Sequence, residues 1–454
     1  MISLTNISNI YFIGIGGIGM SALARYFNSQ GKKVSGYDKT PSPLTNHLKL
    51  EGINITFDDS IETLDKDADL VVYTPAIPAN HLQYNWYKNK DYQVHKRSVV
   101  LGAITQNKFT IAVAGSHGKT TVSSMIAHIL NEAGGCTAFL GGIASNFGSN
   151  YIHTSDKYVV VEADEYDRSF MTLEPNIAVI TAIDSDHLEI YGSLKNIEDE
   201  FVAFTNKIAK DGTLFLNEKY LHIKDRLSNN FILKSYGYKA NNNAVLKEFK
   251  VENNEFQFSV AVEKENIENI KAKFGGVHNL ENATVAIAVC KELGISDEKI
   301  KEALYTFKGI KRRFDKQVEN KNYVYIDDYA HHPEEIKALL NSIKMLYPTK
   351  NIVAVFQPHL FSRTQDLCTD FAEQLSKADE VLLLPIYPAR ELPIEGVTSN
   401  IILSKVNAKH KRIVEKQDLL EVVKNLPKNS VVLTIGAGDI DRFVEPIKDI
   451  LANE

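Results

Sequence analysis

The chain has 454 residues and a formal net charge of −6, from 51 Lys plus Arg against 57 Asp plus Glu. At about 150 residues per domain, this length predicts about three domains. Hydrophobic residues make up 44% and charged residues 24% of the chain, which is typical of globular proteins and argues against disordered or membrane-embedded classes. The mild acidity argues against general binding of nucleic acid, because phosphate backbones require a basic surface.

The N-terminal residues and the cysteines bear on the cellular compartment. No basic stretch precedes an apolar one at the start, and no run approaches about 18 apolar residues, so neither a secretory signal nor membrane insertion is expected. Cys136, Cys290 and Cys368 are far apart and lack metal-ligand spacing. Free thiols are typical of a reducing compartment, so we expect a cytoplasmic protein with its cysteines packed in the core.

The first predicted unit is a strand, a glycine-rich turn, a helix and a second strand. The strands are predicted at 9–13 and 33–37 and the helix at 20–30. The turn contains four glycines, Gly14, Gly16, Gly17 and Gly19. Their spacing is typical of turns that bind a dinucleotide or a diphosphate, and Asp38 follows the second strand near the expected acidic position. By itself this turn fits a nicotinamide cofactor and another nucleotide diphosphate equally well.

A second glycine loop lies between a strand predicted at 110–114 and a helix predicted at 120–133. The loop and the first helical turn read Gly115, Ser116, His117, Gly118, Lys119, Thr120 and Thr121. Backbone N–H groups in this setting cradle phosphates, with Lys119 at the terminal phosphates and Thr120 on Mg²⁺. Val113 stands where the full pattern has glycine, so an ordinary strand-to-helix turn is the alternative.

Candidate metal ligands, a glutamate and a histidine, follow the next two predicted strands. Glu162 comes after a strand at 158–161, and His187 comes shortly after a strand at 177–182. Ligands of open α/β sheets gather at the carboxyl ends of strands, so we expect Glu162 to hold Mg²⁺ opposite the phosphate loop. His187 is expected as a second metal ligand or a base. A solvated acidic turn and a structural histidine are the alternatives.

The remainder of the chain continues the αβ alternation after a polar insertion. Residues 217–270 predict antiparallel strands at a solvent face, and residues 278–283 begin an apolar helix. Further strands are predicted at 70–74, 323–326, 352–356, 380–385 and 431–435, with helices after Pro333 and Thr364.

These patterns predict an α/β protein with three domains and mostly parallel sheets. Residues 1–106 are expected to form a Rossmann-like domain, residues 107–310 a central domain resembling phosphate-loop ATPases, and residues 311–454 a second Rossmann-like domain. A diphosphate turn followed by an ATP turn favours an ATP-driven reaction on a nucleotide-linked substrate, because hydride transfer would leave the second loop unexplained.

The motifs, taken in order, resemble the Mur ligase family over almost the whole chain. The resemblance is carried by Gly14 to Ser21, Gly115 to Thr121, Glu162 to Asp167, Asp186-His187, His278 to Ala283, Arg312 to Phe314, Asp327 to Pro333 and Phe356 to Arg363. It implies ATP-dependent amide ligation in peptidoglycan precursor synthesis, and so a part in cell wall biogenesis, cell shape and division. The members most similar to this chain join L-alanine to UDP-N-acetylmuramate, with ATP and Mg²⁺.

The resemblance also implies roles for individual residues. In the central domain Lys119, Thr120, Glu162 and His187 serve ATP and the metal, and Asn279 and Asn282 lie at the adenine. In the C-terminal domain Arg313 lies at the γ-phosphate, Asp328 near the ribose, His331 near the reacting groups, and Tyr329, His359 and Arg363 at the amino acid. In the first domain the glycine turn holds the UDP diphosphate, and Asp38, Thr74 and Ala76 surround the nucleoside.

The sequence departs from the family pattern at a few positions. Leu360 stands where alanine-adding members often have a second arginine, so carboxylate binding is expected to depend on Arg363 and His359. Tyr166 stands where family members commonly have a small residue after the acidic motif. A tyrosine at this position is also seen in muropeptide ligases, which attach a tripeptide to UDP-N-acetylmuramate. Residues 201–205 offer no lysine for the carbamylation found in several members. The alternatives to an alanine-adding ligase are a muropeptide ligase, a nicotinamide-dependent oxidoreductase and a protein that binds a nucleotide sugar without catalysing a reaction.

Overall fold

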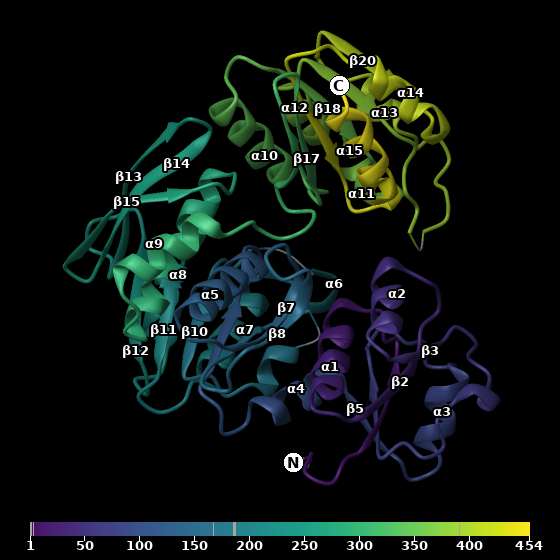
Figure 1. The fold of residues 1–454 in the computed structure, drawn as a ribbon, viewed down its shortest axis with the longest axis vertical. Helices are drawn as coiled ribbons and strands as arrows, with labels where there is room; N and C mark the ends of the chain where they lie inside the picture. Colours follow the sequence, from purple (N-terminus) through teal and green to yellow (C-terminus); the bar gives the residue numbers. More distant parts are fainter. Residues whose placement is uncertain (1, 3, 167, 185–187, 390) are drawn as a thin grey trace. The chain divides into compact units, whose positions relative to one another are not determined.

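The computed structural model describes residues 2, 4–166, 168–184, 188–389 and 391–454. The structure divides into two compact units. Figure 1 shows the helices and strands of both, coloured along the sequence. Unit 1 comprises Met1–Glu248, Phe258–Ile270 and Glu281–Phe307, and unit 2 comprises Phe249–Gln257, Lys271–Leu280 and Lys308–Glu454. In the described residues the strands form three sheets, of five, ten and six strands, and the predicted three-domain α/β fold is confirmed.

The first sheet is parallel and has the strand order β3-β2-β1-β4-β5. Its strands are β1 (Asn9–Ile13), β2 (Lys33–Tyr37), β3 (Asn54–Thr56), β4 (Leu70–Tyr73) and β5 (Gln93–Lys96). Its helices are α1 (Ile18–Ser29), α2 (Pro43–Leu50), α3 (Leu82–Lys88) and α4 (Arg97–Thr105). The strand order reverses beside β1, which places the glycine turn at the switch point where such sheets bind ligands.

The second sheet has the order β15-β14-β13-β12-β11-β10-β6-β9-β7-β8. Its strands are β6 (Thr110–Ala114), β7 (Thr137–Ala144), β8 (Ser149–His153), β9 (Val159–Glu162), β10 (Ile177–Ile180), β11 (Thr213–Asn217), β12 (Ile232–Gly237), β13 (Ala244–Glu252), β14 (Glu255–Val262) and β15 (Glu265–Ala272). Its helices are α5 (Lys119–Ala133), α6 (Leu188–Tyr191), α7 (Leu194–Thr205), α8 (Val277–Glu292) and α9 (Asp297–Thr306).

The prediction of antiparallel strands in residues 217–270 is wrong for β12. This strand pairs in parallel with both β11 and β13. A period-2 pattern of apolar residues reports which face of a strand is buried, but it carries no information about the direction of the neighbouring strand.

The third sheet has the order β16-β17-β21-β18-β19-β20 and is parallel except for β16. Its strands are β16 (Asp315–Glu319), β17 (Tyr323–Asp328), β18 (Asn351–Phe356), β19 (Glu380–Leu383), β20 (His410–Ile413) and β21 (Ser430–Ile435). Its helices are α10 (Pro333–Leu346), α11 (Phe361–Asp366), α12 (Cys368–Leu375), α13 (Asn400–Leu403), α14 (Leu419–Lys424) and α15 (Val444–Ala452). Proline at the first position and a capping box between His332 and Glu335 fix where α10 begins.

The three cysteines are free thiols, as expected. Cys136 and Cys290 are fully buried, but Cys368 is only partly buried at the start of α12, so the expectation of core packing is wrong for this residue. Among the described residues, every helix is too short or too polar to cross a lipid bilayer.

Candidate active site

Two glycines with positive φ shape the loop between β6 and α5. Gly115 has φ +132° and Gly118 has φ +83°, a region that L side chains rarely adopt. A Cβ on Gly115 would also lie 2.2 Å from Thr181 Oγ1, so this position has no room for a side chain. Gly118 is the N-cap of α5, which leaves the first N–H groups of that helix to a ligand. This arrangement is a ready-made phosphate site.

The segment that follows β10 braces the phosphate loop. Ser116 N donates a hydrogen bond to Ala182 O at 3.0 Å, and Asp184 N donates to Ser116 Oγ at 2.9 Å. Thr181 Oγ1 donates to His117 O, and His117 Nε2 lies 3.7 Å from the Asp184 carboxylate. The backbone of the loop is therefore held in place by its neighbouring strand before any ligand enters.

Lys119, the first residue of α5, is paired with a carboxylate that the sequence did not single out. Its Nζ donates to Gly115 O at 2.7 Å and to the two oxygens of Glu165 at 2.8 and 2.9 Å. The Lys119 side chain is 13% exposed and that of Glu165 is 3% exposed. Burial raises the pKa of Glu165, and the ammonium beside it opposes that rise. A phosphate that binds Lys119 must share the ammonium with Glu165 or displace this carboxylate.

Replacing Glu165 with glutamine is expected to tighten ADP binding by about fivefold, because the competing negative charge disappears while the residue keeps its shape. Titration calorimetry on the full chain measures this affinity. Glu132→Gln makes the same charge change at the exposed far end of α5 and should leave the ADP affinity unchanged. Weaker ADP binding in Glu165→Gln would contradict the competition between carboxylate and phosphate.

The expected metal ligands lie beside this loop. Glu162 ends β9, the parallel neighbour of β6, and its Oε2 accepts a hydrogen bond from Gly141 N at 2.9 Å. A Cβ on Gly141 would lie 2.2 Å from the same oxygen, so the glycine makes room for the carboxylate. Thr120 is buried in the first turn of α5. A carboxylate and a hydroxyl are oxygen donors of the kind Mg²⁺ prefers, so these residues fit the metal. His187 lies outside the described residues.

The asparagines expected at the adenine both lie at the start of α8. A Cβ on Gly118 would lie 2.9 Å from Asn282 Oδ1, so Asn282 adjoins the phosphate loop. Asn279 is buried, and its Nδ2 donates to Gly275 O at 2.6 Å. Thr121 is half-buried in the first turn of α5. An adenine contact for either asparagine stays a prediction.

The glycine turn of the first sheet is held by Asp38 and Thr74. Gly16 N donates to Asp38 Oδ2 at 2.7 Å, and a Cβ on Gly16 would lie 2.8 Å from this oxygen. Gly14 has φ +85°, and a Cβ there would lie 2.5 Å from Thr74 Cγ2. Gly17 is the N-cap of α1 and has no side chain to cap it. The structure thus brings together residues that follow β1, β2 and β4.

The last residue expected near the nucleoside, Ala76, follows Thr74 in a turn after β4. Ala76 N donates to Thr74 Oγ1 at 3.5 Å, the long limit for such a bond.

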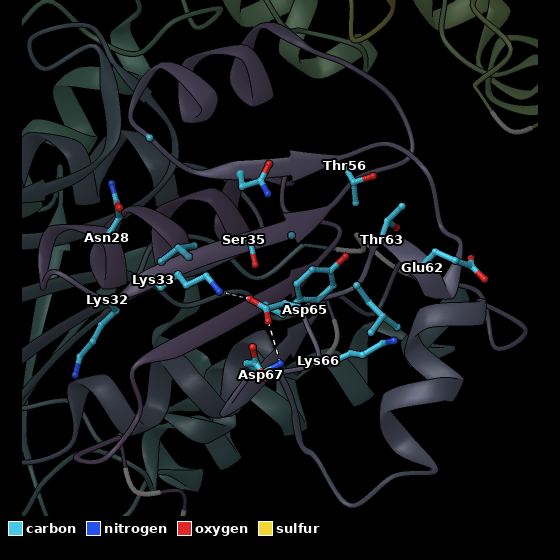
Figure 2. A pocket seen from close by; sticks show the side chains of 16 residues that line it. Asn28, Lys32, Lys33, Ser35, Thr56, Glu62, Thr63, Asp65, Lys66 and Asp67 are labelled. Carbon is cyan, nitrogen blue, oxygen red and sulfur yellow. Dashed lines mark hydrogen bonds and ion pairs between the residues drawn. The ribbon is translucent and has the colours of Figure 1, made fainter.

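A separate pocket of about 720 Å³ runs along β2 and β3, where Lys33 Nζ lies 3.0 Å from Asp65 Oδ2 (Figure 2). Its lining includes none of the residues expected to hold the nucleotide sugar.

In unit 2, aromatic and imidazole rings gather beyond the carboxyl ends of the third sheet. The ring centroids of Tyr329 and His331 are 5.2 Å apart, those of His331 and His359 are 6.2 Å apart, and those of His359 and Tyr387 are 5.8 Å apart. Arg363 lies four residues after His359, in α11. Leu360, which directly follows His359, has φ +69°, which is uncommon for a leucine.

The electrostatics of His331 suit a base. Burial lowers its pKa, Glu335 opposes this shift, and the charges of Arg363 and Arg313 lower the pKa further. A histidine with a lowered pKa is neutral at pH 7 and can accept a proton.

Asp328, expected near the ribose, has a structural task that the sequence did not reveal. Its Oδ2 accepts from Phe314 N at 2.6 Å and its Oδ1 from Ala330 N at 2.8 Å. Burial raises the pKa of Asp328 to about 7, against these hydrogen bonds and the charge of Arg313. Arg312 and Phe314, on either side of Arg313, both have positive φ, so the turn that carries Arg313 is strained. The Asp328 carboxylate anchors this turn through its hydrogen bond from Phe314 N.

Comparison with known proteins adds three family matches and several full-length relatives. Residues 9–109 match the Mur ligase family catalytic domain, residues 113–290 the Mur ligase middle domain, and residues 312–438 the Mur ligase glutamate ligase domain. The chain is 49% identical over 453 residues to a UDP-N-acetylmuramate--L-alanine ligase of Flavobacterium psychrophilum, covering 98% of each chain.

Solved structures of ligases also match this chain over nearly its full length. The UDP-N-acetylmuramate-alanine ligase MurC of Thermotoga maritima matches with a TM-score of 0.85 and 30% identity, over 98% of this chain and 99% of that one. The murein peptide ligase of Psychrobacter arcticus matches with a TM-score of 0.70 and 21% identity, over 98% of this chain and 99% of that one. This second likeness concerns the fold alone.

Proposed function

The chain belongs to the Mur ligase family, and we propose that it joins L-alanine to the lactyl carboxylate of UDP-N-acetylmuramate, with ATP converted to ADP and phosphate. The observation that carries this proposal is the end-to-end similarity to a curated ligase of that activity. The braced phosphate loop and the cluster of imidazole and guanidinium groups in unit 2 support it. The product is a precursor of peptidoglycan.

The first chemical step activates the carboxylate, which is a poor electrophile because its oxygen is a poor leaving group. One carboxylate oxygen attacks the γ-phosphorus of ATP, the bond to the β-phosphate oxygen breaks, and an acyl phosphate and ADP form. Phosphoryl transfer depends on positioning and on neutralising charge. Lys119 and the N-terminus of α5 supply positive charge at the phosphates, and Arg313 is proposed at the γ-phosphate. Mg²⁺ held by Thr120, Glu162 and His187 would neutralise further phosphate charge.

The second step forms the amide. Arg363 and His359 hold the carboxylate of L-alanine, since a guanidinium binds a carboxylate in a planar bidentate pair. The amine nitrogen attacks the acyl carbon, and phosphate leaves with the former carboxylate oxygen. The amine must lose a proton, and His331, whose pKa burial lowers, is the proposed base.

The proposal assigns each segment a substrate. Residues 1–106 bind the nucleotide sugar, residues 107–310 bind ATP and the metal, and residues 311–454 bind the amino acid. The glycine turn of the first segment is held by Asp38 and Thr74 at the switch point of a parallel sheet, which suits a nucleotide diphosphate. A cytoplasmic location stays a prediction.

Substrate choice separates this proposal from a tripeptide-adding enzyme. With ATP, Mg²⁺ and UDP-N-acetylmuramate present, L-alanine is expected to support rapid phosphate release, whereas the stem tripeptide is expected to support almost none. Mass spectrometry of the nucleotide sugar identifies the product in each case. Faster release with the tripeptide would convert the assignment to a muropeptide ligase, and consumption of NAD(P)H in place of ATP would exclude both ligases.

A further inference from the structure

The pocket along β2 and β3 has a polar floor, formed by one row of residues across the first sheet (Figure 2). The parallel register places Tyr11 of β1 beside Ser35 of β2, and Ser35 beside Asn54 of β3. Residues paired in this way point to the same face of a sheet, and all three line the pocket. Lys33, two residues before Ser35, lies on this face as well. The pocket therefore lies over the strands themselves, and none of the glycine-turn residues lines it.

The Ser35 hydroxyl is buried at this floor without a partner. Ser35 is 8% exposed, and its Oγ makes no hydrogen bond with any described residue. Both neighbouring strands, β1 and β3, are described throughout. Apolar side chains are the ordinary occupants of a buried strand position, because a hydroxyl that loses its water there needs another hydrogen-bond partner. The serine therefore points to a ligand that supplies this hydrogen bond.

Residues 62–67 form one side of the pocket, and hydrogen bonds from elsewhere in the domain fix their backbone. Tyr87 OH donates to Asp65 O at 2.7 Å. Tyr92 OH donates to Lys66 O at 2.8 Å. The pocket is thus formed before a ligand enters, as small-molecule sites usually are.

The charges that line the pocket balance. Its three basic side chains are Lys32, Lys33 and Lys66, and its three acidic side chains are Glu62, Asp65 and Asp67. Lys33 and Asp65 already form an ion pair, with 3.0 Å between Nζ and Oδ2. A lining without excess charge of either sign does not select a metal cation or an anion. The ligand is therefore expected to be uncharged.

From this floor and lining we infer that the pocket binds a neutral monosaccharide. The hydroxyl groups of a sugar ring both donate and accept hydrogen bonds, so one ring can meet carboxylates, ammonium groups and the Ser35 hydroxyl together. Further hydroxyl and amide groups in the lining come from Asn28, Asn54, Thr56 and Thr63. The volume of about 720 Å³ lies within the range of small-molecule sites, about 300–1,000 Å³. The inference is independent of the proposed function.

Saturation-transfer difference NMR on the full-length protein tests this inference with D-glucose, D-galactose and D-mannose as probes. At least one of the three is expected to give a saturable signal. The 6-phosphate and the 2-amino derivative of that sugar add a negative or a positive charge to the same ring. Each should bind at least about fivefold more weakly than the neutral sugar, because the balanced lining leaves the added charge without a partner.

Variants of Ser35 locate the bound sugar. Ser35→Ala removes one hydrogen bond to the ligand and should weaken sugar binding by roughly two- to tenfold. Its melting temperature should not fall, because no described partner loses a hydrogen bond. Ser35→Val suits the strand but places methyl groups at the floor and should abolish the signal. The matched control is Ser29→Ala, which removes a hydroxyl that donates to Tyr26 O at 2.8 Å in α1 and should leave sugar binding unchanged.

The inference would be overturned if none of the three sugars bound the wild-type protein. Sugar binding that persists unchanged in Ser35→Val would also overturn it, because the sugar would then lie at another site. Tighter binding of the 6-phosphate than of the neutral sugar would assign the pocket to an anion instead. If Ser35→Val does not fold, Ser35→Ala and Asn54→Ala decide by the same measurement, and unchanged affinity in both would refute the site.

Discussion

Replacement of Lys119 by methionine is expected to reduce ATP-dependent phosphate release by about 1,000-fold or more, measured as kcat/KM for ATP. Lys119 begins α5 directly after the phosphate loop, and its ammonium already binds Gly115 O at 2.7 Å. Methionine has a similar apolar length but no positive charge, so it cannot stabilise the negative charge of the phosphoryl group in the transition state of its transfer. The effect is expected to be the largest of any single substitution considered.

The stability of this variant needs its own control, because the substitution leaves Glu165 buried without its partner. Breaking a buried ion pair on one side costs about 3–5 kcal/mol, and Glu165 is 3% exposed. The double variant Lys119→Met/Glu165→Gln removes both charges and should recover most of the thermal stability. It should remain inactive. Near-normal phosphate release by the folded double variant would refute the role of Lys119.

Replacement of Arg363 by alanine is expected to raise the KM for L-alanine by roughly 10- to 100-fold while the KM for ATP changes by less than about twofold. The reason is the loss of the bidentate pair with the amino-acid carboxylate. Leu360, which directly follows His359, has no charge to compensate for this loss. Steady-state kinetics with each substrate varied in turn separates the two constants.

A matched arginine elsewhere in unit 2 controls for the loss of charge. Arg412 on β20 is 54% exposed and pairs with Glu380 at 3.5 Å, so Arg412→Ala should leave both KM values unchanged. Arg363→Lys keeps the charge but loses the planar fork and should show an intermediate KM for L-alanine. An unchanged alanine KM in Arg363→Ala would move the amino-acid site elsewhere.

Local patterns were sufficient to predict the loops and the strands that bear the candidate site. The strands at 9–13, 33–37 and 110–114 have the predicted bounds. The first and the third are short apolar runs followed by glycine, whereas 33–37 is recognised by its place after the helix of the same strand–turn–helix unit. Strands β7 and β8 were not predicted. Two glycines interrupt the pattern of β7, and β8 is polar, so neither has the signature of a buried strand.

The partners of the predicted residues could not be read from the sequence. Glu165 lies 46 residues from Lys119, so only the folded chain shows that they meet. Asp328 is predicted to lie near the ribose, and its hydrogen bonds to two backbone N–H groups of a turn could not be foreseen from the sequence. The one available hint was the density of acidic residues around Glu165, which does not say which carboxylate faces the phosphate loop.

The central claim, that the chain activates a carboxylate with ATP and then transfers it to L-alanine, predicts the fate of the carboxylate oxygens. UDP-N-acetylmuramate labelled with ¹⁸O in both lactyl carboxylate oxygens is incubated with the full-length protein, ATP, Mg²⁺ and L-alanine. Mass spectrometry then measures the ¹⁸O content of the released phosphate and of the nucleotide-sugar product. One labelled oxygen should appear in the released phosphate, and the other should remain in the new amide. Unlabelled phosphate, or phosphate released without L-alanine joined to the sugar, would contradict the account.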